Sequence, residues 1–267
     1  MKIPRALTIA GSDSSGGAGI QADMKTFSAL GVYALSAVTA LTAQNTLGVS
    51  GIVQIEPEFV SAQIRSVVLD IGVDCVKTGM LANSAIISRV AADLEALEVK
   101  NLVVDPVMIS SSGVRLLDDD AIETLVTRLI PMALVLTPNL HEAEVLTGIR
   151  VERLEDMREA AVRIARLGCG YVLLKGGHLR GNPVDLLYDG SRFRQYSGVR
   201  QETANTHGTG CTFASAVAAF IARGLRVEQA VSGAKAYVGA AIAQGLPLGR
   251  GFGPLHHFYE FYTFLNS

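Results

Sequence analysis

The fold is decided by residues 6–31, which read Ala6-Leu-Thr-Ile-Ala10, then Gly11-Ser-Asp-Ser-Ser-Gly-Gly-Ala-Gly-Ile20, then a helical stretch to Leu30 before Gly31. Four of the five residues at 6–10 are apolar, which predicts a short buried strand. Four glycines within the next nine residues predict a loop, and the following helix ends where Gly31 can close it. A strand, a glycine-rich loop and a helix in succession are typical of nucleotide and phosphate sites.

Two well-known nucleotide loops do not account for this stretch. Gly17-Ala-Gly-Ile-Gln-Ala22 matches the G-x-G-x-x-A dinucleotide pattern, but that pattern needs an acidic residue about 20 positions later to hold a ribose. Residues 25–55 contain no Asp or Glu. A Walker A loop is excluded because G-K-[ST] occurs nowhere in the chain.

Composition sets the class of protein. The chain has 267 residues, of which 49% are hydrophobic and 18% charged, as expected for a well-packed globular protein. A net charge of −2 gives no reason to expect nucleic acid or an anionic membrane as a partner. We see no signal-peptide pattern and no apolar stretch long enough to span a membrane. Three widely separated cysteines without a CxxC pair predict reduced thiols in a cytoplasmic protein.

At least six predicted strands alternate with helices, which predicts one α/β domain over residues 1–267 with a doubly wound, mostly parallel sheet. The Asp189-Gly190 turn lies between two alternating segments and predicts an antiparallel hairpin at one sheet edge. Residues 41–48, rich in amides and hydroxyls, are expected to form a connection. The predicted strands are 6–10, 34–40, 52–55, 73–77, 101–108, 133–137, 171–174, 184–188 and 192–196. The predicted helices are 20–30, 57–69, 83–97, 118–130, 155–167, 209–222, 227–244 and 255–265.

Polar residues follow several of these strands, and parallel α/β sheets bind ligands at the carboxyl ends of strands. Asp105 ends one strand, where it is either a ligand-binding carboxylate or a turn-forming Asp-Pro pair with Pro106. Lys175 ends another strand and could reach a phosphate or simply be solvated. Asn139 and Glu142 form a capping-box-like pattern, or alternatively face a hydrated Mg²⁺.

Residues 207–216, His-Gly-Thr-Gly-Cys-Thr-Phe-Ala-Ser-Ala, predict a helix that begins at a glycine turn. Unpaired N–H groups at such a start favour an anion. The same dipole would favour a thiolate at Cys211, although a buried structural cysteine is the plain alternative. Residues 109–113 are expected to form a Ser/Gly loop. Gln44 is either a loop residue or, because its amide offers donor and acceptor together, a reader of an aminopyrimidine edge.

Six motifs in this order resemble those of the hydroxymethylpyrimidine/phosphomethylpyrimidine kinases of thiamin biosynthesis, within the ribokinase-like superfamily. The resemblance covers essentially the whole chain. The motifs are Gly11-Ser-Asp-Ser-Ser-Gly-Gly-Ala-Gly-Ile-Gln-Ala-Asp23, Thr42-Ala-Gln-Asn45, Lys77-Thr-Gly-Met80, Asp105-Pro-Val-Met108, Thr137-Pro-Asn-Leu-x-Glu142 and His207-Gly-Thr-Gly-Cys-Thr212.

The resemblance implies a kinase that uses ATP and Mg²⁺ to phosphorylate 4-amino-5-hydroxymethyl-2-methylpyrimidine and then the monophosphate. It implies an anion hole of Gly208–Cys211 amides, with Gly208 and Gly210 in the loop and Cys211 as the base. The remaining implied roles are pyrimidine binding by Gln44, Asp23, Gly11, Met80 and Val107, nucleotide binding by Thr209, Lys175 and Asn139, and metal binding by Asp105 and Glu142. A homodimer is implied as well.

Three alternatives stay open at this point. One is a pyridoxal kinase of the same superfamily, since some of these enzymes share the Gly-Thr-Gly-Cys loop. A non-catalytic vitamin sensor on this fold would not need the phosphate-binding residues. A dinucleotide oxidoreductase would need the acidic residue that residues 25–55 lack.

Overall fold

The computed structural model describes residues 2–109, 117, 119–177, 179 and 181–262, and within them nine strands form one mixed sheet. The strand order is β3-β2-β1-β4-β5-β6-β7-β8-β9. The strands are β1 (Arg5–Asp13), β2 (Tyr33–Asn45), β3 (Gly48–Gln54), β4 (Cys75–Thr78), β5 (Leu102–Val104), β6 (Val135–Leu136), β7 (Tyr171–Leu174), β8 (Val184–Tyr188) and β9 (Phe193–Ser197).

The central strands, which are β2, β1, β4, β5, β6 and β7 in spatial order, run parallel. The chain winds outward from β1 in both directions. β2 lies on one side of β1 and β4 on the other. The point between β1 and β4 is therefore the topological switch point at which such sheets bind ligands. The predicted doubly wound α/β fold is confirmed, and so is the antiparallel β8–β9 hairpin at one edge.

The opposite edge corrects one expectation. Residues 41–48 were expected to form a connection, but β2 continues to Asn45 and pairs antiparallel with β3. The sheet thus has antiparallel strands at both edges. The turn is tight because the Asn45 Oδ1 accepts from the Leu47 amide at 2.8 Å. Residues 41–48 extend beyond the core, so this part of the hairpin lacks the apolar alternation that would have predicted it.

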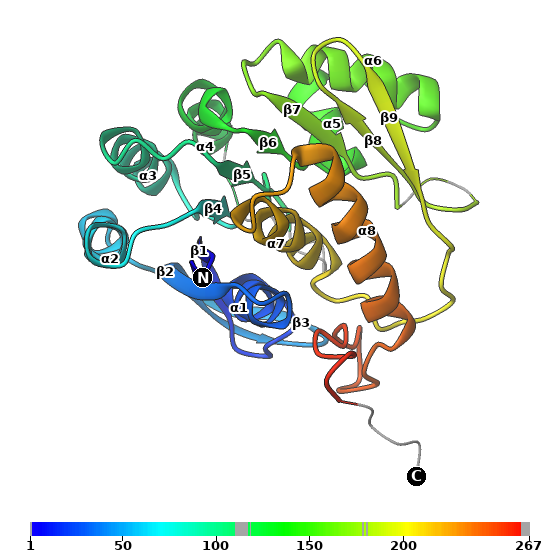
Figure 1. Cartoon of the computed structure of the whole chain (residues 1–267), viewed down its shortest axis with the longest axis horizontal. Coiled ribbons are helices and arrows are strands. Elements are labelled where there is room, and N and C mark those ends of the chain that lie inside the picture. The colour runs from blue at the N-terminus through cyan, green and yellow to red at the C-terminus, as the bar shows by residue number, and fades with distance from the viewer. Residues whose placement is uncertain (1, 110–116, 118, 178, 180, 263–267) are drawn as a thin grey trace.

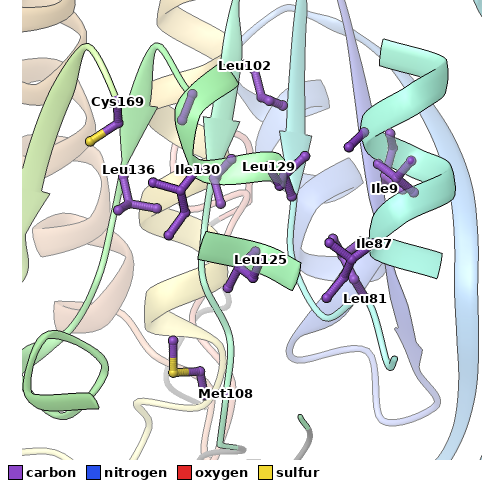
Figure 2. Packing of buried hydrophobic residues seen from close by; sticks show 14 of the residues in the cluster. Ile9, Leu81, Ile87, Leu102, Met108, Leu125, Leu129, Ile130, Leu136 and Cys169 are labelled. Carbon is purple, nitrogen blue, oxygen red and sulfur yellow. The ribbon is translucent and has the colours of Figure 1, made fainter. Parts of the chain in front are cut away.

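Helices cover both faces of the sheet (Figure 1). α1, α7 and α8 pack on one face, where α7 and α8 lie side by side. The other helices contribute to the larger apolar cluster on the second face, part of which Figure 2 shows around Leu129 and Leu102. The helices are α1 (Gly19–Ala29), α2 (Pro57–Asp70), α3 (Ser84–Ala96), α4 (Asp119–Thr124), α5 (Leu140–Thr147), α6 (Leu154–Ala165), α7 (Thr209–Ala222) and α8 (Val227–Ala243).

Most predicted helices are confirmed to within a few residues, but two differ. The helix expected over 118–130 is α4 followed by a π-helical turn at Leu125–Leu129 and a 3₁₀ turn at Ile130–Met132; residue 118 lies outside the described residues. Residues 255–262 of the helix expected over 255–265 form turns and irregular backbone instead, and the main chain at the start of this segment is bonded to α8. The His256 amide donates to the Ala241 carbonyl, and the His257 carbonyl accepts from the Tyr237 hydroxyl.

Two glycine-containing loops pack backbone against backbone near the switch point. Gly208, which precedes α7, has a left-handed φ of 79°. A Cβ at this position would collide with the carbonyl oxygen of Gly17, in the loop after β1. Neighbouring Gly17 has no room for a Cβ either, because the His207 ring lies against it. The start of α7 can therefore approach the β1 loop only because both positions are glycine.

The segment after α8 packs against the first turn of α7. The His257 Nε2 lies 3.0 Å from the Thr212 hydroxyl, and both side chains are buried. Burial, together with the nearby Lys25 ammonium, lowers the pKa of His257 to about 3. The folded protein therefore holds this imidazole neutral. Within the described residues, no helix has the length and apolar character needed to cross a bilayer.

Replacement of Gly208 by alanine is expected to destabilise the protein more than replacement of a glycine with the same backbone but free space. Gly31 has a φ of 73° and no atom near its would-be Cβ, so Gly31→Ala should cost about 1 kcal/mol of left-handed strain. Gly208→Ala adds a backbone collision and should cost about 3 kcal/mol or more. Urea unfolding of both variants measures this difference, and equal losses would contradict the close packing.

Acid should destabilise the protein partly through His257. Its pKa is near 6.5 in the unfolded chain and lower in the folded one, so its contribution is present above about pH 6.5 and is lost as pH falls toward 3. Between pH 6.5 and 4.5, His257→Gln should lose about 2 kcal/mol less free energy of unfolding than the parent protein. His141→Gln, which removes an exposed histidine, is the control and should follow the parent curve.

Candidate active site

The strands change character at their carboxyl ends, on the face that α7 covers. Side chains alternate between faces of a strand, so residues two apart point the same way. The buried apolar residues on this face, one from each of four neighbouring strands, are Cys75, Val103, Val135 and Leu173. The residues two positions later are all polar and lie in a row beneath the start of α7, namely Lys77, Asp105, Thr137 and Lys175.

Lys175 and Asp105 form an ion pair within this row. The Lys175 Nζ lies 2.7 Å from the Asp105 Oδ1, which also accepts from the Thr137 hydroxyl at 3.1 Å. A Cβ built on Gly210 would lie 3.5 Å from the same ammonium, so Lys175 sits under the first turn of α7. Burial acts to lower the pKa of Lys175, but the Asp105 and Glu142 carboxylates outweigh it and raise the pKa. Lys175 is therefore a permanent cation.

The loop that carries Lys175 is held by a second ion pair. Asp185, on β8, accepts from the Gly176 amide at 3.0 Å through one oxygen. Its other oxygen lies 2.6 Å from the ammonium of Lys235, on α8. The residue immediately after Lys175 is thus fixed to two further elements, which limits how far the lysine can move.

Asn139 and Glu142 form the predicted capping box at the start of α5. The Asn139 side chain accepts from the Glu142 amide at 2.9 Å, and the Glu142 carboxylate accepts from the Asn139 amide at 2.7 Å. Glu142 is buried, and burial raises its pKa to about 7 despite the opposing effect of Lys175. The capping interpretation is confirmed, and the same carboxyl group lies in the electrostatic field of Lys175 and Asp105.

The donor set fits a hydrated Mg²⁺ but does not form a closed metal cage. Among the described residues, no three His, Cys, Asp or Glu side chains group together as metal ligands. Mg²⁺ usually keeps several waters and takes one or two carboxylates together with substrate phosphates. The Asp105 and Glu142 carboxyl groups supply that number of oxygen ligands, so these residues suit a metal that arrives with a nucleotide.

Asp23, which the resemblance implies as a pyrimidine ligand, has no exposed surface in this structure. Its carboxylate accepts from the Thr8 and Ser215 hydroxyls, each at 2.6 Å, and from the Lys77 ammonium at 2.9 and 3.0 Å. Direct contact between Asp23 and a substrate would require one of these partners to leave.

Lys77 is a residue of this region to which the sequence motifs assigned no role. Its side chain is completely buried, and Asp23 is its ion-pair partner. The available signal was the lysine that follows the apolar pair Cys75-Val76 in a buried strand, where an unpaired charge would be costly. Only the tertiary structure supplies its partner.

His207 connects the two glycine-containing loops to the β2–β3 hairpin. Its Nε2 lies 2.9 Å from the Asp13 Oδ2 and 3.4 Å from the Gln44 Nε2. Burial of Asp13 acts to raise its pKa, but hydrogen bonds from His207, Ser15 and Ala18 outweigh it and lower the pKa to about 2. Gln44 is half-buried, and its Oε1 accepts from the Thr42 hydroxyl at 3.1 Å.

Cys211 lies in the first turn of α7, partly exposed, with the Gly19 amide directed at its sulfur. The helix start was expected to favour the thiolate. That expectation is wrong for the unliganded protein, because burial outweighs the Lys77 ammonium and the Gly19 amide and raises the pKa to about 11. Cys75 and Cys169 are buried free thiols.

The remaining predicted residues lie around these groups. Met80 packs on Gly11, where an added Cβ would lie 3.2 Å from the Met80 sulfur. Val107 is half-buried in the turn after β5, and its amide donates to the Asp105 carbonyl at 2.8 Å. Thr209 opens α7, and its hydroxyl donates to the Thr206 carbonyl at 2.7 Å. Ser110–Gly113, expected to form a loop, lie outside the described residues.

Comparison with known proteins agrees with this arrangement. The family model described as phosphomethylpyrimidine kinase matches residues 13–256. The hydroxymethylpyrimidine/phosphomethylpyrimidine kinase of Streptomyces coelicolor is 51% identical over 254 residues, covering 95% of this chain and 94% of that protein. A thiamine biosynthesis bifunctional protein of Geobacter sulfurreducens is 53% identical, covering 94% of this chain, but the chain spans only 51% of its length.

A solved structure also resembles the whole chain. The pyridoxal kinase from Staphylococcus aureus, in complex with AMP-PCP and pyridoxal, superposes with a TM-score of 0.90 at 37% identity, over 98% of this chain and 96% of that one. The ribokinase-like fold implied by the motifs is therefore confirmed. On these matches, the chain belongs to the phosphomethylpyrimidine kinase family, as its sequence motifs predicted.

Proposed function

We propose that this protein uses ATP to phosphorylate the hydroxymethyl group of 4-amino-5-hydroxymethyl-2-methylpyrimidine, and then phosphorylates the monophosphate to the diphosphate. The observation that carries the proposal is the position of Lys175. Its ammonium lies beneath Gly210, at the helix start where backbone N–H groups are unpaired. A cation and oriented amides at one point suit a phosphoryl group in transfer.

The amides of Gly208–Cys211 would surround the transferred phosphoryl group, and Lys175 would neutralise the phosphates of ATP. Thr209 and Asn139 would lie toward the nucleotide. Mg²⁺, held by Asp105 and Glu142 through water, supplies charge neutralisation when bound. Because Lys175 and Asp105 pair with each other at 2.7 Å, nucleotide binding requires each to exchange its partner, Lys175 for phosphate and Asp105 for the metal.

At the other end of the site, Gln44 would read the pyrimidine edge, with Gly11, Met80 and Val107 packing against the ring. A side-chain amide presents donor and acceptor together, which matches an amino group beside a ring nitrogen. Asp23 would contribute through Lys77 and Ser215 in the observed arrangement, since these groups enclose its carboxylate.

In the first phosphorylation, the hydroxymethyl oxygen would give its proton to the Cys211 thiolate and attack the γ-phosphorus, while the bond to the bridging oxygen breaks and ADP leaves. In the second, the nucleophile is already an anionic phosphate and needs no strong base. Cys211 should therefore matter chiefly in the first step. With a pKa of about 11, about one Cys211 in ten thousand is a thiolate at pH 7.

A pyridoxal kinase is the second candidate, because the structurally similar S. aureus enzyme was solved with pyridoxal. Both substrates are small aromatic rings that carry a hydroxymethyl group.

A homodimer and a cytoplasmic location stay predictions. Exposed apolar side chains on the β2–β3 hairpin, including Leu47 and Val53, support a protein contact at that edge.

Coupled measurement of ADP release tests the proposed function. The pyrimidine alcohol and its monophosphate should both be turned over with higher kcat/KM than pyridoxal. A clear preference for pyridoxal would replace the assignment with the second candidate. Binding of the pyrimidine without any ADP release would favour a non-catalytic sensor.

Replacement of Cys211 should separate the two phosphorylations. We expect Cys211→Ala to lower kcat for the alcohol by about 10²- to 10⁴-fold, the usual contribution of a general base, and to affect the monophosphate reaction much less. In the parent enzyme, kcat/KM for the alcohol should rise as pH increases above 7, because the deprotonated thiol is the active form and burial raises its pKa. Equal losses in the two steps would exclude a base role limited to the first.

A further inference from the structure

The Asp23–Lys77 pair is the most deeply buried ion pair near the site, with neither side chain exposed to solvent. Four elements contribute to it. Thr8 and Lys77 are register partners on the adjacent strands β1 and β4, Asp23 comes from α1, and Ser215 from α7. The pair therefore lies at the switch point of the sheet, under the helix that carries Cys211.

Stability alone is a poor reason for such a pair. Burying two charges removes their hydration, and buried ion pairs are often no more stabilising than apolar residues of similar volume. In this protein the neighbouring positions on the same face are apolar, including Ala6 and Cys75. A pair of apolar residues at positions 23 and 77 would continue that pattern. The charges are thus better explained by an effect on a neighbouring group.

That neighbour is Cys211. Ser215 follows Cys211 by four residues on α7, so the two side chains lie on one face of the helix. Ser215 donates to Asp23 at 2.6 Å, which places the pair beneath this face. Two of the three N–H groups of Lys77 are accounted for by the Asp23 oxygens. The charged groups that face Cys211 are Lys77 from β4, Asp23 from α1, Asp105 after β5 and Lys175 after β7.

We propose that the Asp23–Lys77 pair positions Cys211 and sets the charge around it. The Lys77 ammonium favours the Cys211 thiolate. The Asp23 carboxylate holds Lys77 in place and, because it is negative, partly offsets the effect of Lys77. The two residues act on the first phosphorylation through Cys211 and without touching the reacting atoms. The proposal rests on the role of Cys211 proposed above, and it assigns Asp23 a function that requires no contact with the pyrimidine.

The two partners should have opposite effects on the reactivity of Cys211. Both Lys77→Met and Asp23→Asn break the same ion pair, so a purely structural role predicts changes in the same direction. We expect Lys77→Met to lower the rate of Cys211 alkylation by iodoacetamide at pH 8 by about tenfold, equivalent to one pKa unit. Asp23→Asn should raise it several-fold. Peptide mass spectrometry separates Cys211 from Cys75 and Cys169.

Arg5→Met is the matched control. It breaks another ion pair, with Asp74 at 3.0 Å, at the opposite end of β1. Alkylation of Cys211 should be unchanged in this variant. If Lys77→Met does not fold, the sign of the Asp23→Asn effect still decides, because a rise supports the proposal and a fall or no change overturns it. A fall in both variants of the pair would likewise overturn it.

A double-mutant cycle on the alcohol reaction provides the second readout. If Lys77 acts through Cys211, the Lys77→Met/Cys211→Ala variant should be no slower than the slower single variant. Fully additive losses would overturn the proposal. Failure of the proposed function and failure of this inference can be told apart, since alkylation of Cys211 needs no substrate. A parent protein without ADP release would refute the proposed function and leave the alkylation result to be judged separately.

Discussion

The unpaired N–H groups at the start of α7 are the constraint on which the rest of the site depends. They favour negative charge at one point above the switch between β1 and β4. The strands beneath these N–H groups end in polar residues on that face, and two of those residues are lysines, which add positive charge. In the unliganded protein Asp23 and Asp105 balance these lysines. The site is therefore nearly neutral at rest although most of its groups are charged.

Sequence was most informative where local interactions decide the structure. α7 has the predicted limits, because a glycine turn before an apolar run fixes both its start and its buried face. The Asn139–Glu142 capping box needs only residues three positions apart, and the order of strands and helices predicted the doubly wound sheet. The family follows from motifs, each short, whose joint order is specific.

Sequence was least informative where distant residues decide. Asp23 lies 54 positions from Lys77 and 192 from Ser215, so no local pattern predicts its enclosure. The high pKa of Cys211 results from burial by several elements, which the dipole argument at a single helix start omits. Residues 41–48 formed a hairpin because an extended ribbon outside the core needs no apolar alternation. Turns replaced the last predicted helix, and the start of that segment is bonded to α8, a contact that no local pattern predicts.

The contact between Gly17 and Gly208 has a consequence for how this protein can change. The two loops that shape the phosphate end meet through main-chain atoms, so substitution there meets a collision and cannot adjust the geometry gradually. The residues around the predicted ring site, such as Met80 and Val107, contribute half-buried side chains and not main-chain contacts of this kind. Preference among ring substrates can accordingly drift while the apparatus for phosphate stays rigid. In this architecture the side chains around the ring can be substituted during evolution, whereas the glycines at the loop contact have to be retained.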